Sequence, residues 1–181
     1  EGDYFWRDGS RYAPHNVYTS SKLLDGYLDG KKMEKGEFEP WEFKDDLPLE
    51  KRTESEPIRI RFRTEDYSVE WKYDKDMDDY VRYMGGKQHK DKNGDEIRAK
   101  NIAISYIKSQ VYDGAGRLKM ENIGSGKAVI CLDGKCEEGS WEKKTGLSRM
   151  RFYDKMKKEI KFNAGATWIE VVRPGYEVYG I

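Results

Sequence analysis

The chain has 181 residues, of which 34 are basic and 34 acidic, so its formal net charge at pH 7 is zero. Hydrophobic residues make up 36% and charged residues 38%, so aromatic side chains must supply much of the core. A neutral total gives no electrostatic reason to expect a nucleic acid or an anionic membrane as partner. No stretch is apolar over the ~20 residues that span a bilayer.

The N-terminal part shows little regular periodicity. The chain begins at Glu1 without a basic start or an apolar signal region, so we expect a fragment whose signal peptide or lipid anchor lies outside it. Ser and Thr residues at 19–21 predict the cap of a short helix over about 22–32, with apolar residues on one face. Residues 34–56 mix prolines and charges and are typical of an irregular crossing segment.

From Pro57 onward the hydrophobic period changes to two. Residues 58–63 alternate apolar side chains with arginines, and residues 67–73 alternate apolar side chains with polar ones. A turn at Glu65-Asp66 separates them, so we predict a hairpin with one buried face and opposite charges paired on its outer face.

Seven further short strands are predicted, at 101–112, 117–123, 127–132, 135–143, 148–153, 159–163 and 167–172. The predicted turns between them include Gly124-Ser125-Gly126 and Asp133-Gly134. This pattern favours an α+β chain that is predominantly antiparallel β, a curled meander, barrel- or sandwich-like, with one short helix near the N-terminus. We expect residues 1–56 to be the loop-rich tail of an N-terminal domain and residues 57–181 to form a β-rich C-terminal domain.

Two cysteines occur, in the segment Cys131-Leu-Asp-Gly-Lys-Cys136. If Asp133-Gly134 forms a two-residue turn, Cys131 faces Cys136 in a non-hydrogen-bonded pair, with Cα atoms ~4.5 Å apart. That separation is near the range of a disulfide, which we therefore predict. A pair of reduced thiols remains an alternative. A metal site is a weaker one, because two thiols alone leave zinc half-ligated.

Only two histidines are available for acid–base chemistry or metal binding. We take His15 and Asn16 in one polar segment, and Arg82, His89 and Asp91 in another, as candidate binding residues. In the second segment, Asp91 is placed to orient the His89 imidazole. The alternative is that each histidine pins a loop by hydrogen bonds. We find no nucleophile elbow and no His-Glu-x-x-His motif, so no catalytic residue, metal or cofactor is predicted.

Two other motifs are interpreted as structural. Gly124-Ser-Gly-Lys-Ala128 resembles the end of a phosphate-binding loop, but Glu121 and Ala128 replace the required Gly and Ser/Thr, so we predict a turn. A local cluster of lysines is interpreted as a solvated strand edge. Its members are Lys155, Lys157, Lys158 and Lys161.

Several of these motifs occur in the same order in a known family. The chain resembles the YerB-like family of predicted lipoproteins from Gram-positive bacteria, whose domain has no known function. The stretches that carry the resemblance lie at 5–8, 13–20, 83–91, 99–102, 124–128, 139–143 and 165–169. The resemblance implies an extracytoplasmic protein tethered to a membrane, and it implies no catalytic residues.

Our leading hypothesis is therefore a non-enzymatic binding or scaffolding domain at the cell envelope. Its partner would be an envelope protein or a cell-wall component, with membrane contact only through an N-terminal anchor absent from this chain. The alternative is a hydrolase or metal-dependent enzyme acting on envelope material through His15, His89 and Asp91.

Overall fold

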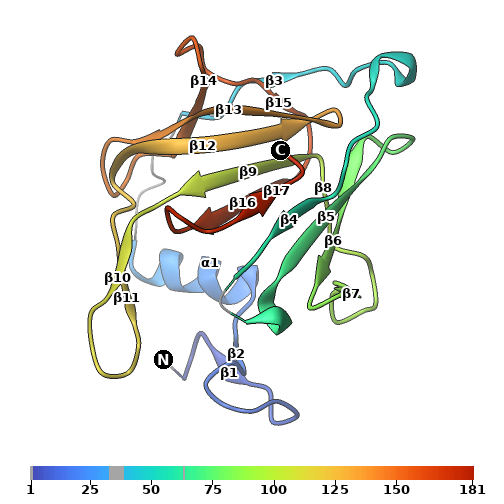
Figure 1. The fold of residues 1–181 in the computed structure, drawn as a ribbon. Coiled ribbons are helices and arrows are strands. Elements are labelled where there is room, and N and C mark those ends of the chain that lie inside the picture. Colours follow the sequence, from blue (N-terminus) through green and yellow to red (C-terminus); the bar gives the residue numbers. More distant parts are fainter. Residues whose placement is uncertain (1, 33–38, 63) are drawn as a thin grey trace. The chain divides into compact units, whose positions relative to one another are not determined.

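A computed structural model describes residues 2–32, 39–62 and 64–181 (Figure 1). The chain divides into two compact units, Glu1–Phe38 and Glu39–Ile181, which are described separately here. Residues 39–56, which the sequence assigns to the N-terminal domain, belong to the second unit in the structure.

The first unit contains a small hairpin and a helix. Strand β1 (Trp6–Arg7) pairs with β2 (Val17–Tyr18), and helix α1 spans Ser21–Gly30. The predicted cap is confirmed, because the Ser20 hydroxyl accepts a hydrogen bond from the Leu23 amide at 3.3 Å. The helix ends two residues before the predicted limit, and the apolar residues of its predicted face are half-buried or exposed.

The second unit is built on two open sheets. The six-stranded sheet has the order β17 (Val178–Tyr179), β4 (Ile58–Ile60), β5 (Val69–Asp74), β6 (Asp79–Met84) and β7 (Lys87–Gln88), with β8 (Arg98–Ala99) also pairing with β6. The five-stranded sheet has the order β14 (Arg151–Asp154), β13 (Lys135–Lys143), β12 (Gly124–Leu132), β9 (Asn101–Tyr106) and β16 (Thr167–Val172).

Smaller elements lie outside the two sheets. These are the hairpin β10 (Ser109–Val111) with β11 (Leu118–Met120), the pair β3 (Phe43–Lys44) with β15 (Phe162–Asn163), and the 3-10 turns η1 (Leu49–Lys51) and η2 (Glu65–Tyr67). The predicted fold class is confirmed, since most ladders are antiparallel and one α-helix occurs among the described residues. Parallel pairing of β16 with β9 and of β15 with β3 departs from a simple meander.

Apolar side chains on both faces of the five-stranded sheet form two core clusters. One lies between the two sheets and includes Trp71 and Ile58 from the first sheet and Ile102, Ile104 and Val129 from the second. The other covers the opposite face of the five-stranded sheet, with Trp141, Phe152 and Phe162 among its buried members. The arrangement is therefore sandwich-like around the first cluster.

Both predicted hairpins form, and the pairing of Cys131 with Cys136 is the predicted one. The connection of the first hairpin is longer than a turn at Glu65-Asp66, since β4 ends at Ile60 and β5 begins at Val69. In β4 and β5, Ile58 pairs with Trp71, and Arg59 lies opposite Glu70 with an ion pair of 2.6 Å on the outer face. In β12 and β13, Cys131 lies opposite Cys136, and the two sulfur atoms are bonded, as predicted. Because Asp133 and Gly134 both have positive φ, they form the tight two-residue turn that fixes this register.

Two sequence interpretations are wrong at the level of local structure. The sequence predicts no strand around Arg82, but Asp79–Met84 is the strand β6. Gly124–Gly126 is read as a turn, but it begins β12. A Cβ atom on Gly126 would lie 2.7 Å from Nε1 of the buried Trp141, so this glycine lets the strand pass close to the indole ring.

Polar contacts join residues 39–56 to the rest of the second unit. The Trp41 indole donates to the Met150 carbonyl at 2.8 Å. Arg52 donates to the carbonyl of Lys75 at 2.9 Å, and Lys44 pairs with Asp133 at 2.8 Å. These partners are distant in sequence, which explains why composition alone places the boundary later in the chain.

Candidate functional site

A groove of about 790 Å³ opens over strands β12 and β13. Lys127 lies opposite Ser140 in the ladder and Val129 lies opposite Glu138, so these four residues share one face of the sheet. Val129 also belongs to the core between the two sheets. The groove is therefore the part of the inner face that the six-stranded sheet leaves uncovered, and a volume of this size suits a small ligand or a short segment of a polymer.

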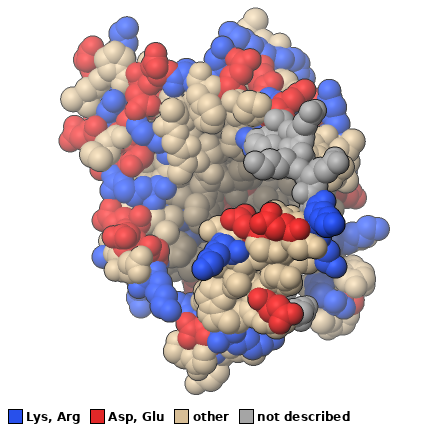
Figure 2. Space-filling model, turned by 180° about the vertical axis from the view of Figure 1, so that it is seen from behind, with Lys and Arg blue, Asp and Glu red and all other residues tan. Residues whose placement is uncertain are grey.

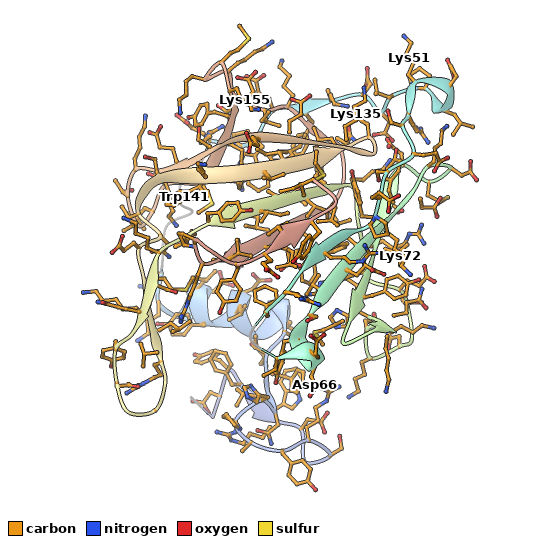
Figure 3. All side chains as sticks on the ribbon, in the orientation of Figure 1. Lys51, Asp66, Lys72, Lys135, Trp141 and Lys155 are labelled. Carbon is orange, nitrogen blue, oxygen red and sulfur yellow. A yellow bond between two sulfur atoms is a disulfide. The ribbon has the colours of Figure 1, made fainter. Side chains whose placement is uncertain are left out.

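Other segments complete the walls. They are residues of the strand ends and turns that flank the sheet and of the C-terminal segment, including Tyr106, Lys108, Lys155, Lys157, Pro174 and Ile181. Figure 3 labels Lys155, which follows β14, and Trp141, whose indole donates to the Tyr106 carbonyl at 3.0 Å. The walls thus combine apolar surface with charged side chains.

The charged groups of the groove are coupled. Lys155 lies 3.1 Å from Glu138, and this contact lowers the pKa of the Glu138 carboxyl. Burial and the nearby Glu138 carboxylate raise the pKa of the Tyr106 hydroxyl. Lys157 donates to the Ser140 hydroxyl at 3.1 Å. The groove therefore offers ammonium donors, a hydroxyl and a carboxylate at neutral pH.

The sequence candidate Arg82 lies between the sheets, away from the residues that line this groove. It is 6% exposed, and its guanidinium lies over the rings of Trp168 at 4.7 Å and Trp71 at 5.6 Å. Its Nε lies 3.4 Å from Oε1 of Glu170, which also accepts from the Trp71 indole at 3.0 Å. A buried cation held by two rings and a carboxylate is well suited to fixing the two sheets together.

The structure brings His89 to Arg82. Nδ1 of His89 lies 2.7 Å from Nη1 of Arg82, so the imidazole accepts from the guanidinium and carries its proton on Nε2. Burial and the Arg82 charge both lower the pKa of His89. Asp91 is exposed, and its Oδ1 accepts from the amides of Asn93 and Asp95, where it closes a turn.

The other sequence candidates, His15 and Asn16, belong to the first unit. His15 is exposed, whereas Asn16 is buried. The Asn16 side chain accepts from Arg7 at 2.7 Å and donates to the carbonyls of Asp8 and Arg11 at 3.2 and 3.1 Å. Asn16 therefore organises the loop that carries His15.

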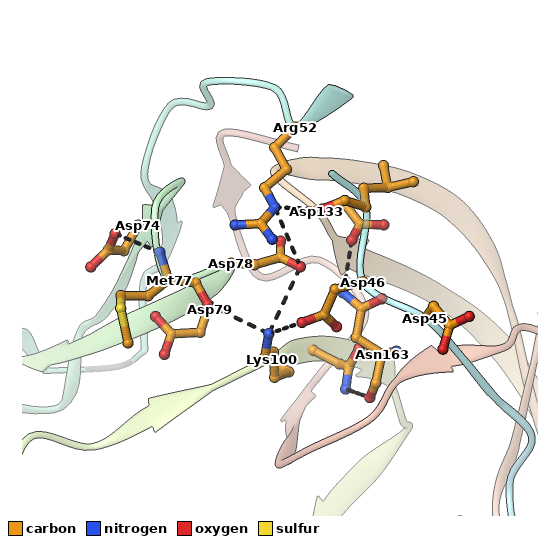
Figure 4. Close-up of polar contacts among 12 residues, drawn as sticks. Asp45, Asp46, Arg52, Asp74, Met77, Asp78, Asp79, Lys100, Asp133 and Asn163 are labelled. Carbon is orange, nitrogen blue, oxygen red and sulfur yellow. Dashed lines mark hydrogen bonds and ion pairs between the residues drawn. The ribbon is translucent and has the colours of Figure 1, made fainter. Parts of the chain in front are cut away.

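A second polar cluster surrounds Asp78, whose side chain is wholly buried (Figure 4). Its Oδ1 accepts from the Tyr73 hydroxyl at 2.6 Å, and its Oδ2 lies 3.8 Å from Arg52 and 3.9 Å from Lys100. Burial and the hydrogen bond to Asp78 raise the pKa of Tyr73. Lys100 in turn pairs with Asp46, so the cluster joins residues 39–56 to the β6 and β9 strands.

No metal site is evident in the described parts of the chain. No group of three or more His, Cys, Asp or Glu side chains there is placed to hold a metal ion. On the face shown in Figure 2, basic and acidic side chains are interspersed. No helix within residues 2–32, 39–62 and 64–181 is long and apolar enough to cross a membrane.

Comparisons with known proteins agree with the resemblance read from the sequence. The family model described as "Protein of unknown function (DUF3048) C-terminal domain" matches residues 58–169. The curated Bacillus subtilis (strain 168) protein "Putative lipoprotein YerB" is 29% identical over 179 residues, with 95% of this chain and 52% of that protein covered. The chain thus spans about half the length of that relative.

The same relative provides a structural match. The crystal structure of the YerB protein from Bacillus subtilis matches with a TM-score of 0.78 and 26% identity, covering 98% of this chain and 60% of that chain. The name of the relative suggests anchoring at the membrane. It does not specify a ligand.

Proposed function

We propose that this chain, which belongs to the DUF3048 family through its C-terminal domain, is a ligand-binding part of a lipoprotein exposed at the cell envelope. The name of the Bacillus relative supports the location. The groove over β12 and β13 carries the binding proposal, because it is an open surface on an otherwise covered sheet face. Its ligand would be an envelope protein or a cell-wall component.

The geometry supports binding better than catalysis. The Arg82 guanidinium occupies Nδ1 of His89, and an oxygen of Asp91 is engaged in its own turn. A histidine that acts as a general base needs an acceptor nitrogen directed at the substrate and a partner that stabilises its protonated form. A neighbouring cation does the opposite, because it disfavours imidazolium. The contact with Arg82 therefore argues against His89 as the general base of a hydrolase.

A substitution that fills the groove tests the proposal. Ser125 is exposed and lines the groove, so Ser125→Trp should obstruct it without burying a polar group. The probes are lipid-free cell walls and detergent-solubilised membrane proteins of Bacillus subtilis, neither of which contains a bilayer. We expect saturable binding of the unmodified chain to one of these probes, and at least tenfold weaker binding of Ser125→Trp.

Asn93→Trp provides the matched control, because Asn93 is exposed in the turn closed by Asp91 and does not line the groove. This variant should bind as the unmodified chain does, and all three proteins should have the same melting temperature. Equal binding by Ser125→Trp, or no saturable binding to either probe, would overturn the proposal.

A further inference from the structure

The charge of this neutral chain is unevenly distributed. Residues 143–158 contain seven Lys and Arg residues and one acidic residue, Asp154, a surplus of six positive charges. This segment comprises the end of β13, the edge strand β14 and the two turns that flank β14. We call it the β14 edge. Acidic side chains of neighbouring segments, Glu138, Glu39 and Glu159, pair with Lys155 and Arg151, so the remaining surplus lies mainly on the other lysines of this edge.

The two turns of the β14 edge each expose an apolar side chain. Leu147, in the turn before β14, is 99% exposed, and Met156, in the turn after it, is 89% exposed. Isolated exposed apolar residues are common on protein surfaces. These two are the most exposed aliphatic side chains of the described residues, and each lies within a few residues of basic side chains at one end of a four-residue strand.

Apart from Lys143, which is half-buried, the basic side chains of this edge divide into two groups. Arg151 pairs with Glu159 at 2.6 Å and with Glu39 at 2.9 Å, and Arg149 lies over the Trp41 ring, so both arginines serve the fold. The exposed group contains lysines: Lys144, Lys155, Lys157 and Lys158. Within the described residues, Lys155 is the member of that group that forms an ion pair, with Glu138.

We propose that the β14 edge docks on an anionic phospholipid surface, with Leu147 and Met156 inserted among the headgroups and the lysines near the lipid phosphates. The lysines supply long-range attraction to a negative membrane. The apolar tips distinguish a lipid surface from a soluble polyanion, because only the bilayer offers an apolar phase in which to bury them. The edge shares Lys155 and Lys157 with the wall of the groove, whereas Lys144, Leu147, Met156 and Lys158 do not line it. Docking of the edge adds a second membrane contact to the anchor expected from the sequence.

Vesicle sedimentation with the unmodified 181-residue chain tests the proposal. We expect binding to vesicles of equal parts phosphatidylglycerol and phosphatidylcholine and none to pure phosphatidylcholine. Raising the salt concentration to 1 M, where the Debye length is about 3 Å, should weaken the binding. Neither vesicle contains protein or cell wall, so failure here is distinct from failure of the groove proposal.

Two paired variants separate the charge from the apolar tips. Lys144→Glu/Lys158→Glu should weaken vesicle binding at least tenfold, whereas Lys51→Glu/Lys119→Glu, which reverses two exposed lysines outside the edge, should change it less than threefold. Leu147→Ser/Met156→Ser should also weaken it at least threefold, whereas Met77→Ser/Val111→Ser, at exposed positions elsewhere, should not. Melting temperatures should be unchanged throughout.

Three outcomes would overturn the proposal. The first is equal binding to neutral and anionic vesicles. The second is equal weakening by the edge and control variants. The third is binding of long-chain polyphosphate that does not depend on Leu147 and Met156, together with no binding to vesicles, which would assign the edge to a soluble polyanion.

Discussion

His89 and Arg82 are joined by a contact of 2.7 Å between Nδ1 of the imidazole and Nη1 of the guanidinium. Arginine has no acceptor, so the contact requires a neutral histidine. Protonation of His89 would remove the acceptor and place a second positive charge against the first. The contact is therefore formed at neutral pH and opposed by acid.

We predict a decrease in stability as the pH falls below about 6.5, the ordinary pKa of histidine. Burial and Arg82 lower the pKa of His89 in the folded chain, so the unfolded chain binds the proton at a higher pH. Above both pKa values the imidazole is neutral in the folded and the unfolded chain, so His89 contributes no pH dependence to the stability. Between them, stability is lost as the pH falls. The free energy of unfolding, measured in urea at a series of pH values from 8 to 5, tests this prediction.

His89→Gln keeps a hydrogen-bond acceptor but does not titrate, so it should flatten the dependence in that window. The matched control is His15→Gln, which removes the exposed histidine and should leave the dependence intact. A dependence that is the same in both variants would show that another group is responsible. His89→Ala should in addition lower the free energy of unfolding by about 1–3 kcal/mol, because Arg82 loses an acceptor.

The buried pair formed by Arg82 and Glu170 leads to a second prediction. Both side chains are 7% exposed, so removing Glu170 leaves a buried cation without its carboxylate. Glu170→Ala should lower the free energy of unfolding by about 3–5 kcal/mol. The control is Glu70→Ala, which breaks the more exposed pair with Arg59 and should cost less than about 1 kcal/mol. Equal effects in chemical denaturation would contradict this account of the core.

The hairpins could be predicted because their signals are local. One buried face imposes a period of two on residues 58–62 and 69–73, and an Asp-Gly turn fixes the pairing of Cys131 with Cys136. The strand β6 lacks such a signal. Tyr80, Val81 and Arg82 are buried in succession, so this strand shows no alternation between inside and outside.

Only part of each candidate site can be predicted from the sequence. His89 and Arg82 are seven residues apart, and the sequence places them in one segment. Glu170, which completes the cluster, is 88 residues from Arg82, and no pattern near either residue connects them. The groove combines β12 and β13 with residues near the C-terminus, so it depends on tertiary packing. The basic β14 edge is visible in the sequence, although a neutral total obscures it.

Gly126 provides a test of packing beside the groove. A Cβ atom there would lie 2.7 Å from Nε1 of Trp141 and 2.9 Å from the Tyr106 carbonyl oxygen, the two atoms joined by the indole hydrogen bond. Gly126→Ala should therefore lower the free energy of unfolding by about 1–3 kcal/mol through overpacking. Gly146→Ala, where a Cβ meets nothing within 4 Å, should change it by less than about 0.5 kcal/mol. Similar values for the two variants in urea unfolding would contradict this.

The disulfide between Cys131 and Cys136 yields the last prediction. Protein purified without reductant and then denatured should show no titratable thiol. The loop that the bond closes is short, so the chain-entropy model gives only about 2 kcal/mol of stabilisation, to be measured by urea unfolding with and without reductant. The same turn carries Asp133, which pairs with Lys44. Reduction should therefore accelerate amide exchange around Lys44 more than around the β4–β5 hairpin. Two free thiols in the purified protein, or exchange that rises equally in both regions, would contradict this.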